Sequence, residues 1–134
     1  MCGIAGFWGP PNRELLATMT GLITHRGPDG EGFFEHDVAS LGHRRLAIID
    51  PVGGHQPVGT DDGQVQLTYN GEVYNFRELR AELIAAGHVF HTACDTEVVL
   101  HAYVEWGTDC FPRFNGMWAL ALLDLRPQDR KSVV

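Results

Sequence analysis

The sequence lacks several features that would place it in a specialised class of protein. It has no run of lysine or arginine, and its 134 residues carry a formal net charge of −7, which disfavours nucleic acid or an anionic membrane surface as a partner. No apolar run reaches the roughly 18 residues of a membrane span, and no secretory signal pattern opens the chain. We therefore expect a soluble, cytoplasmic protein that acts on a small molecule.

Cysteine is scarce as well. The only three are Cys2, Cys94 and Cys110, an odd and widely spaced set that favours reduced thiols over a disulfide framework. The seven histidines include the close pair His88 and His91, but no HExxH or CxxC spacing occurs, so we expect no metal site. The proportions of hydrophobic residues, 44%, and charged residues, 20%, suit a single globular domain.

Apolar periodicity divides the chain into strands and helices. It predicts strands over residues 4–9, 32–34, 38–41, 45–49, 65–69, 88–91 and 117–125. It predicts helices over about 13–23, from 75 to 87, and along a segment with Val98, Val99, Ala102 and Tyr103 that ends before 107. Residues 32–41 suggest a hairpin, residues 50–63 a loop, and residues 126–129 a turn into a return strand that stops at Val134.

Local signals predict how these elements begin and pack. Asn12 can cap the first helix, whose expected buried face holds Leu15, Met19, Leu22 and Ile23. Asn75 with Glu78 resembles a capping box for the second helix, whose expected buried positions are Phe76, Leu79, Leu83 and Ile84. Asn70-Gly71 is typical of a tight turn, and residues 117–125 are apolar enough for a strand buried on both faces.

Cys2 is the most informative residue of the chain. Removal of Met1 would leave a first residue that carries both a thiol and a free α-amino group. Such an amine is partly unprotonated at neutral pH and can accept the thiol proton, so one residue could start an acyl transfer. Gly3 leaves room for a substrate beside it. The competing interpretation is a chance cysteine at the second position, and the remaining motifs have to decide.

Four further segments are polar and spaced as no hydrophobic core requires. They are His25–Gly30 (HRGPDG), Gly42–Leu46 (GHRRL), Tyr69–Asn75 (YNGEVYN) and Asp95–Glu97 (DTE). Together with Cys2 they resemble the class II glutamine amidotransferases, and most closely the amino-terminal glutaminase domain of the glutamine-hydrolysing asparagine synthetases. The resemblance runs from Cys2 to about Leu125, nearly the whole chain.

This resemblance implies an α+β fold, the N-terminal-nucleophile αββα sandwich, in which two antiparallel sheets pack face to face between helical layers. The predicted order of elements is compatible with that fold and with other α+β folds. The resemblance also implies that residues 1–134 are a glutamine amidotransferase domain that is incomplete at its C-terminus. An unpaired sheet edge at that point predicts marginal stability or aggregation.

The activity that the resemblance implies is hydrolysis of the side-chain amide of L-glutamine through a γ-glutamyl thioester on Cys2. The α-amine of Cys2 would serve first as general base and then as general acid. Asn70 and Gly71 would form the oxyanion hole with a side-chain amide and a backbone N–H. From the residues alone, Asn70-Gly71 could simply turn the chain, and the two roles can hold together.

Glutamine recognition calls for a cation that binds the α-carboxylate and an anion that binds the α-ammonium. The resemblance assigns Arg45 to the carboxylate, which its planar guanidinium can bind through two hydrogen bonds. It assigns Glu72 and Asp95 to the ammonium and places Leu46 and Ile48 along the substrate. Taken without the family, Arg45 could be a solvated surface charge and Asp95 the N-cap of the following helix.

Three other residues carry finer expectations. Arg26 and Asp29 could brace one another and order the loop around Cys2. Cys94 stands where the family more often has serine, which leaves open whether position 94 donates the hydrogen bond that would orient Asp95.

In the family, a second domain adenylates aspartate with ATP and receives ammonia through an internal tunnel. That domain and its Ser-Gly-Gly pyrophosphate loop are absent from this sequence, so we expect no cofactor here, and ATP and Mg only in the missing synthetase domain. The expected partners are L-glutamine and that ammonia-accepting domain, with a homodimer left open.

Two alternatives to the asparagine branch stay open. The first is another class II amidotransferase, such as one that makes glucosamine phosphate or phosphoribosylamine, although the segment from Tyr69 to Leu79 favours the asparagine branch. The second is a non-catalytic module that binds glutamine or a partner chain without turnover, of which retention of Met1 would be the simplest sign.

Overall fold

The computed structural model describes residues 1–48, 52–127 and 132–133. Its elements in chain order are β1 (Gly3–Trp8), α1 (Arg13–Leu22), the 3₁₀ helix η1 (Thr24–Arg26), β2 (Gly30–His36), β3 (Ala39–Arg45), β4 (Val58–Gly59), β5 (Val65–Val73), α2 (Phe76–Ala85), α3 (Asp95–Trp106), the 3₁₀ helix η2 (Gly107–Arg113), β6 (Gly116–Asp124) and β7 (Ser132–Val133). No helix in these ranges is long and apolar enough to cross a membrane.

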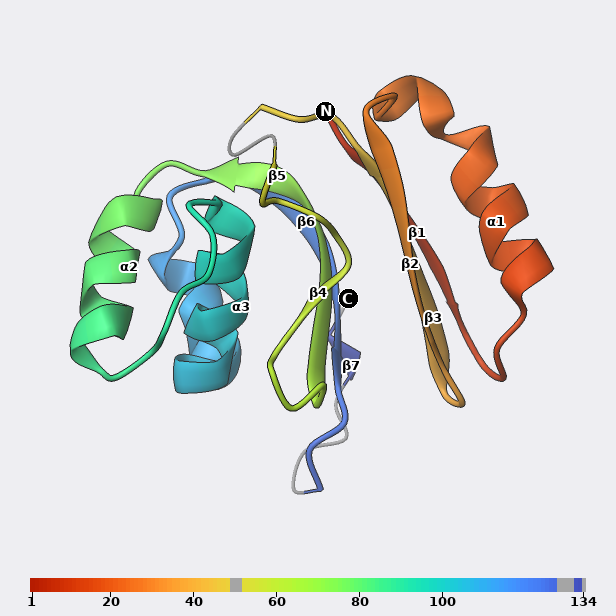
Figure 1. The fold of residues 1–134 in the computed structure, drawn as a ribbon. Coiled ribbons are helices and arrows are strands. Elements are labelled where there is room, and N and C mark those ends of the chain that lie inside the picture. The colour runs from red at the N-terminus through yellow and green to blue at the C-terminus, as the bar shows by residue number, and fades with distance from the viewer. Residues whose placement is uncertain (49–51, 128–131, 134) are drawn as a thin grey trace.

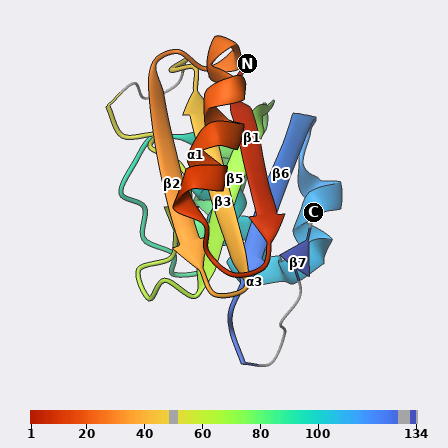
Figure 2. The same cartoon turned by 90° about the vertical axis from the view of Figure 1, so that its right-hand side faces the viewer.

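Two antiparallel sheets face each other, and helices cover their outer sides (Figure 1). The first sheet has the strand order β1-β3-β2 and carries α1, which lies across it in the rotated view of Figure 2. The second sheet has the order β4-β5-β6-β7 and is covered by α2 and α3. This αββα arrangement confirms the predicted fold class.

The larger core lies between the second sheet and its two helices. Its fully buried members include Leu67 and Tyr69 of β5, Leu83 of α2, and Val98 and Val99 of α3. Each such apolar side chain contributes roughly 1.5–3 kcal/mol when it leaves water. The predicted buried positions of α3 are confirmed, whereas in α2 Phe76 is only partly buried and Ile84 is exposed.

The buried face of α1 is not the predicted one. Asn12 caps the helix as expected, because its Oδ1 accepts a hydrogen bond from the backbone N–H of Leu15 at 3.0 Å. Leu16 and Thr20 are the residues that it buries. The reason is Gly42 on β3, where a Cβ would lie 2.3 Å from Thr20 Oγ1, so this stripe of the helix meets the sheet. None of the four predicted residues is fully buried: Leu15, Met19, Leu22 and Ile23.

Three of those residues instead line an apolar groove of about 740 Å³ between the two sheets. They are Met19, Leu22 and Ile23, which lie opposite Leu120–Leu123 of β6. The strand β1 forms another wall of this groove and the edge of the first sheet. The helical periodicity of the sequence identifies these apolar side chains. It does not distinguish a residue that lines a groove from one that packs in a core.

The start of α2 also differs from the prediction. Asn75 makes no capping hydrogen bond to the helix. Its Nδ2 donates to the carbonyl of Arg113 at 3.0 Å, and its Oδ1 accepts from the N–H of Asn115 at 2.9 Å. The capping box was therefore wrong, because the amide joins the start of α2 to the segment that leads into β6. Gly87 ends the helix as expected, with φ of +101°.

Residues 88–91 form no strand, because the backbone N–H groups of this segment have other partners. The N–H of His88 donates to the carbonyl of Leu83 and closes α2. The N–H groups of His91 and Thr92 each donate to the carboxylate of Glu97 at 2.8 Å. Burial alone would raise the pKa of Glu97, but these hydrogen bonds, with one from the Thr92 hydroxyl, lower it.

The strand β6 is buried only in its second half. Leu120, Leu122 and Leu123 are buried, whereas Met117 is 70% exposed, so the prediction of a strand buried on both faces was wrong for its first half. The return strand is present as β7, which pairs with β6 at Leu122–Val133. Parts of four predicted elements lie outside the described residues. They are residue 49 of the strand 45–49, residues 50 and 51 of the loop, residues 128 and 129 of the turn, and residues 130, 131 and 134 around the return strand.

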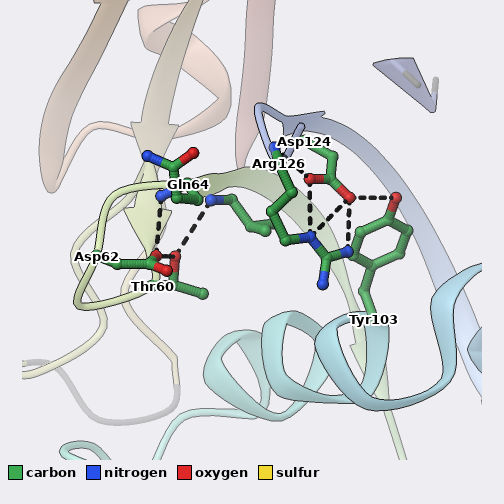
Figure 3. A network of polar contacts seen from close by, with 7 residues as sticks. Thr60, Asp62, Gln64, Tyr103, Asp124 and Arg126 are labelled. Atoms are coloured by element: carbon green, nitrogen blue, oxygen red, sulfur yellow. Dashed lines mark hydrogen bonds and ion pairs between the residues drawn. The ribbon is translucent and has the colours of Figure 1, made fainter. Parts of the chain in front are cut away.

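A charged network fixes the end of β6 (Figure 3). The Arg126 guanidinium donates to the Asp124 carboxylate, with Nε 2.9 Å from Oδ1 and Nη2 2.6 Å from Oδ2. The hydroxyl of Tyr103 on α3 donates to the same carboxylate at 3.1 Å. Burial alone would raise the pKa of Asp124, but these hydrogen bonds lower it. A buried carboxylate thereby connects β6 to α3 with its oxygens satisfied.

His43 connects the two sheets. It is fully buried on β3, and its Nδ1 lies 3.0 Å from Oγ1 of Thr68 on β5. Its Nε2 has no hydrogen-bond partner within the described residues. Burial, and then the positive charge of Arg45, lower the pKa of His43 to about 4. The folded protein therefore holds this imidazole neutral at pH 7.

We expect the free energy of unfolding to fall as the pH drops from about 6.5 towards 4. In that window the unfolded chain binds a proton on His43 that the folded protein does not, so acid favours unfolding by up to about 3 kcal/mol. Urea unfolding at a series of pH values measures the slope. His43→Gln keeps a polar side chain without the titration and should flatten this part of the curve. An equal slope in both proteins would contradict the assignment.

Candidate active site

One pocket gathers all of the predicted site residues. It is a cavity of about 280 Å³, near the lower end of the roughly 300–1,000 Å³ that is usual for small-molecule sites. The N-terminus, the end of β3, the second half of β5 and the start of α3 supply its walls. The eight predicted residues that line it are Cys2, Arg45, Leu46, Ile48, Asn70, Gly71, Glu72 and Asp95.

The register of the first sheet positions Cys2. Because β1 runs antiparallel to β3 and Gly3 pairs with Arg44, the register directs Cys2 towards Arg45, and its Sγ contacts the neighbouring Leu46. The backbone N–H of Leu46 donates to Cys2 Sγ at 3.3 Å, and Sγ donates to the Leu46 carbonyl at 3.6 Å. Arg26 Nε donates to the Cys2 carbonyl at 3.0 Å. Cys2 is therefore held at its thiol by Leu46 and at its backbone carbonyl by Arg26.

Met1 is 70% exposed and lines the same pocket. In the full sequence its carbonyl holds the nitrogen of Cys2 in a peptide bond. Removal of Met1 would place a free α-amine at the pocket, next to the thiol of the same residue, and would clear space for a ligand.

The predicted contact between Arg26 and Asp29 is absent from the hydrogen bonds and ion pairs of the described residues. Arg26 binds the Cys2 carbonyl, as above. Asp29 binds the other wall of the pocket, because its Oδ2 accepts from Ala47 N–H at 2.9 Å and its own N–H donates to the Arg45 carbonyl at 2.9 Å. Arg26 therefore binds the backbone of Cys2, and Asp29 binds the backbone of Arg45 and Ala47; the two side chains do not bind each other.

Asn70 and Gly71 lie inside β5, not in a tight turn. They pair with Ala119 and Trp118 in an unbroken ladder with β6. Gly71 does not have the positive φ of the glycines that turn the chain. A Cβ on Gly71 would lie 2.4 Å from the carbonyl oxygen of Met117, so glycine is required here by the close approach of β6. The turn prediction was therefore wrong.

The alternation of β5 directs the N–H of Gly71 into the pocket. The N–H groups of Tyr69 and Val73 donate to side chains off the ladder, to Gln56 Oε1 at 2.6 Å and to Asp95 Oδ2 at 3.2 Å. Backbone groups two residues apart in a strand point the same way, so the Gly71 N–H between them faces the same side. Asn70, the residue before it, lines the same cavity.

Charges of both signs meet in the pocket. Arg45 and Asp95 are nearly buried, with 8% and 4% of their surface exposed, and Glu72 is exposed at the rim. Gly54 packs closely between the two sides, since a Cβ there would lie 2.5 Å from Arg45 Nη2 and 3.2 Å from Cys94 Sγ. A guanidinium and a carboxylate in one small cavity suit a zwitterionic amino acid.

Three groups fix the carboxylate of Asp95. Its Oδ2 accepts from the Tyr69 hydroxyl at 3.0 Å and from the Val73 N–H, and its Oδ1 from the Cys94 thiol at 3.6 Å. Burial, and then the charge of Asp95, raise the pKa of Tyr69, so its hydroxyl stays a donor. Asp95 is the first residue of α3 and Cys94 its N-cap, so capping is not the role of Asp95, and a thiol supplies the hydrogen bond that the sequence left open.

Sequence reasoning missed several polar residues that line the pocket, among them Gln56, Tyr69 and Thr96. Tyr69 and Thr96 stand inside the motifs YNGEVYN and DTE, which could have drawn attention to them. Gln56 stands in the segment predicted as a loop, and no local pattern marks it as buried.

The two close histidines do not act together. Nδ1 of His88 lies 3.0 Å from Nδ1 of His101, and its Nε2 lies 2.7 Å from Oε2 of Glu105. Nε2 of His91 lies 3.6 Å from Oδ1 of Asp61. Within residues 1–48, 52–127 and 132–133, no group of three or more His, Cys, Asp or Glu side chains is placed to hold a metal ion.

Comparison with known proteins identifies one family. A family model described as a glutamine amidotransferase domain matches residues 1–133. Glutamine-hydrolyzing asparagine synthetase 3 of Bacillus subtilis (strain 168) is 42% identical over 132 residues, which cover 92% of this chain and 21% of that protein. Glutamine-hydrolyzing asparagine synthetase 2 of Oryza sativa subsp. japonica is 40% identical over 131 residues, 94% of this chain and 22% of that protein. The chain thus spans about a fifth of the length of these curated relatives.

A solved structure shares the fold. Glutamine phosphoribosylpyrophosphate amidotransferase from B. subtilis, complexed with ADP and GMP, aligns with a TM-score of 0.72 over 91% of this chain and 35% of that chain. The two sequences are 20% identical, so the likeness concerns the arrangement of the sheets and helices.

We expect Gly71→Ala to destabilise the protein by about 1–3 kcal/mol, because the added methyl group forces β5 and β6 apart. Gly21→Ala is the matched control, since a Cβ on this helical glycine meets nothing within 4 Å, and the change should be neutral or stabilising by up to about 1 kcal/mol. Urea unfolding compares the two. If Gly71→Ala were as stable as the parent, the close approach of β6 would be refuted.

Proposed function

We propose that this chain, which belongs to the glutamine amidotransferase domain family, hydrolyses the side-chain amide of L-glutamine. The observation that carries the proposal is the convergence of a thiol, a guanidinium and a carboxylate, from Cys2, Arg45 and Asp95, on one small cavity. These three groups complement the reacting amide, the α-carboxylate and the α-ammonium of a single amino acid. The family membership and the two backbone-anchored donors on β5 support the same reaction.

Glutamine binds through the two charged groups on its α-carbon. The Arg45 guanidinium takes the α-carboxylate through paired hydrogen bonds. The carboxylate of Asp95, held by Tyr69 and Val73, accepts from the α-ammonium, and Glu72 adds a second negative charge at the rim. Leu46 and Ile48 line the cavity beside the methylene groups. The side-chain amide is then left to face Cys2.

The reaction starts once Met1 has been removed. The free α-amine of Cys2 takes the thiol proton, and Sγ attacks the amide carbon of glutamine. The Leu46 N–H, 3.3 Å from Sγ, stabilises the thiolate. The Asn70 amide and the Gly71 N–H bind the oxyanion that forms, an interaction whose loss typically costs about 100- to 1,000-fold in rate.

Collapse of this intermediate breaks the carbon–nitrogen bond. The protonated α-amine returns its proton to the leaving group, ammonia departs, and a γ-glutamyl thioester remains on Cys2. Water activated by the same amine then hydrolyses the thioester to glutamate and frees the thiol. The thiol, the amine and the two oxyanion donors carry every step, so this proposal requires no metal or cofactor from residues 1–134.

We further propose that the ammonia serves asparagine synthesis in an acceptor domain outside this chain, and that ATP and Mg act there. The names of the relatives support this acceptor, as does the fraction of their length that the chain spans. Another class II amidotransferase would use the same pocket, but the segment Tyr69–Asn75 favours the asparagine branch. The free thiols of the chain suit a reducing compartment, for which we propose the cytoplasm.

We expect Cys2→Ala to reduce glutamate release from L-glutamine to background, a loss of at least about a thousandfold, because the nucleophile is gone. The assay is glutamate and ammonia release by protein whose intact mass shows that Met1 is absent. Cys110→Ala is the matched control, since Cys110 is buried in the core away from the pocket.

Two outcomes would contradict the proposal. One is full activity in Cys2→Ala. The other is a folded parent protein, free of Met1, that binds glutamine without releasing glutamate, which would favour the non-catalytic module.

A further inference from the structure

We infer that Gln56 is a positioning residue that holds Asp95 in place for glutamine recognition, through a closed ring of buried hydrogen bonds. The inference rests on the proposed function, because it assumes that Asp95 binds the α-ammonium of the substrate.

Gln56 joins two elements that carry the two halves of the site. Its Oε1 accepts from the N–H of Tyr69 on β5 at 2.6 Å, and its Nε2 donates to Oγ1 of Thr96 on α3 at 3.3 Å. Tyr69 precedes Asn70, and Thr96 follows Asp95. The Gln56 side chain is 9% exposed and lines the pocket. The side-chain amide of Gln56 therefore connects β5, which carries the proposed oxyanion donors, to the start of α3, which carries Asp95.

The contacts continue from Thr96 back to Tyr69. Thr96 Oγ1 lies 3.4 Å from Cys94 Sγ, and Cys94 Sγ donates to Asp95 Oδ1 at 3.6 Å. The other carboxylate oxygen of Asp95 accepts from the Tyr69 hydroxyl at 3.0 Å. The ring thus begins at the backbone N–H of Tyr69 and ends at its side chain.

From the Tyr69 N–H through Gln56 and Thr96 to Asp95 the donors follow one direction, and the Tyr69 hydroxyl donates to the same carboxylate from the other side. The Tyr69 N–H can only donate, so the amide oxygen of Gln56 must face it and the NH₂ group must face Thr96. Thr96 accepts there and has its own hydrogen left for Cys94 Sγ, and the thiol then donates to Asp95. Burial raises the pKa of Cys94, although its hydrogen bonds to Thr96 oppose this, so the thiol keeps its proton. Each donor leads to a carboxylate that only accepts.

A side chain is needed because the neighbouring strand stops short. β4 pairs with β5 at Val58–Leu67 and Gly59–Gln66. β4 begins at Val58, so the ladder does not extend to Tyr69. Without Gln56, the Tyr69 N–H would be a buried donor with no partner. Since β5 is fixed by its nine pairs with β6, the element that loses its support in a Gln56 variant is the start of α3, which carries Asp95.

The test compares L-glutamine with glutaramic acid, which is glutamine without the α-ammonium. We expect Gln56→Met to lower kcat/KM for L-glutamine about tenfold, mainly through KM, and for glutaramic acid by no more than about twofold. Gln66→Met, which replaces a glutamine of β5 outside the pocket, should change neither value. Equal losses on both substrates would overturn the inference, because a merely structural defect does not distinguish them.

Thr96→Val breaks the same link from the other side and should give the same split, even if Gln56→Met does not fold. Thr96→Ser keeps the hydroxyl and should retain the preference for L-glutamine. The double variant Gln56→Met/Thr96→Val should be no worse than either single variant, since both remove one shared contact. Additive losses would overturn the inference.

Asp95→Asn separates this inference from the proposed function. It should abolish most of the preference for L-glutamine over glutaramic acid. A parent protein that hydrolyses neither compound, or an Asp95→Asn variant with an unchanged preference, would overturn the proposed function and this inference with it. An active parent whose preference depends on Asp95 but not on Gln56 would overturn the inference alone.

Discussion

The pairing of β5 with β6 is the constraint on which the candidate site depends. Nine consecutive pairs hold β5 in one register, and the missing side chain of Gly71 lets β6 come close enough to make them. The alternation of a strand then turns the N–H groups of Tyr69, Gly71 and Val73 to one side. Two of these bind Gln56 and Asp95, and the one between them faces the cavity, so a single strand positions both the proposed oxyanion donors and the proposed ammonium acceptor.

The first sheet contributes through the same periodicity. His43 and Arg45 lie two residues apart on β3 and therefore share the face towards the second sheet. His43 meets Thr68 there, while Arg45 reaches the pocket. The charge of Arg45 is one of the two reasons why His43 remains neutral. The histidine that joins the sheets thus senses the charge of the cation that lines the pocket.

The residues that the motifs singled out lie together in the fold, whereas several predictions of local structure were wrong. All eight predicted site residues line one pocket. They could be recognised from the sequence because Cys2, GHRRL, YNGEVYN and DTE contain polar and charged residues that a hydrophobic core does not need. Local rules failed where a distant partner decided the outcome. Asn70-Gly71 forms a strand because β6 pairs with it, Asn75 binds the backbone beside β6 and not its own helix, and Glu97 takes the N–H groups that a strand over 88–91 would need. Gln56 gave no signal, because its importance lies in contacts 13 and 40 residues away.

The pocket is lined by two thiols, those of Cys2 and Cys94. We propose that only Cys2 attacks the amide of glutamine. The most direct test is rapid acid quench of the protein during turnover of L-glutamine, followed by intact mass and peptide mapping. We expect a transient adduct of one γ-glutamyl group on an N-terminal peptide that begins at Cys2. An adduct on Cys94, or steady turnover without any adduct, would contradict this proposal.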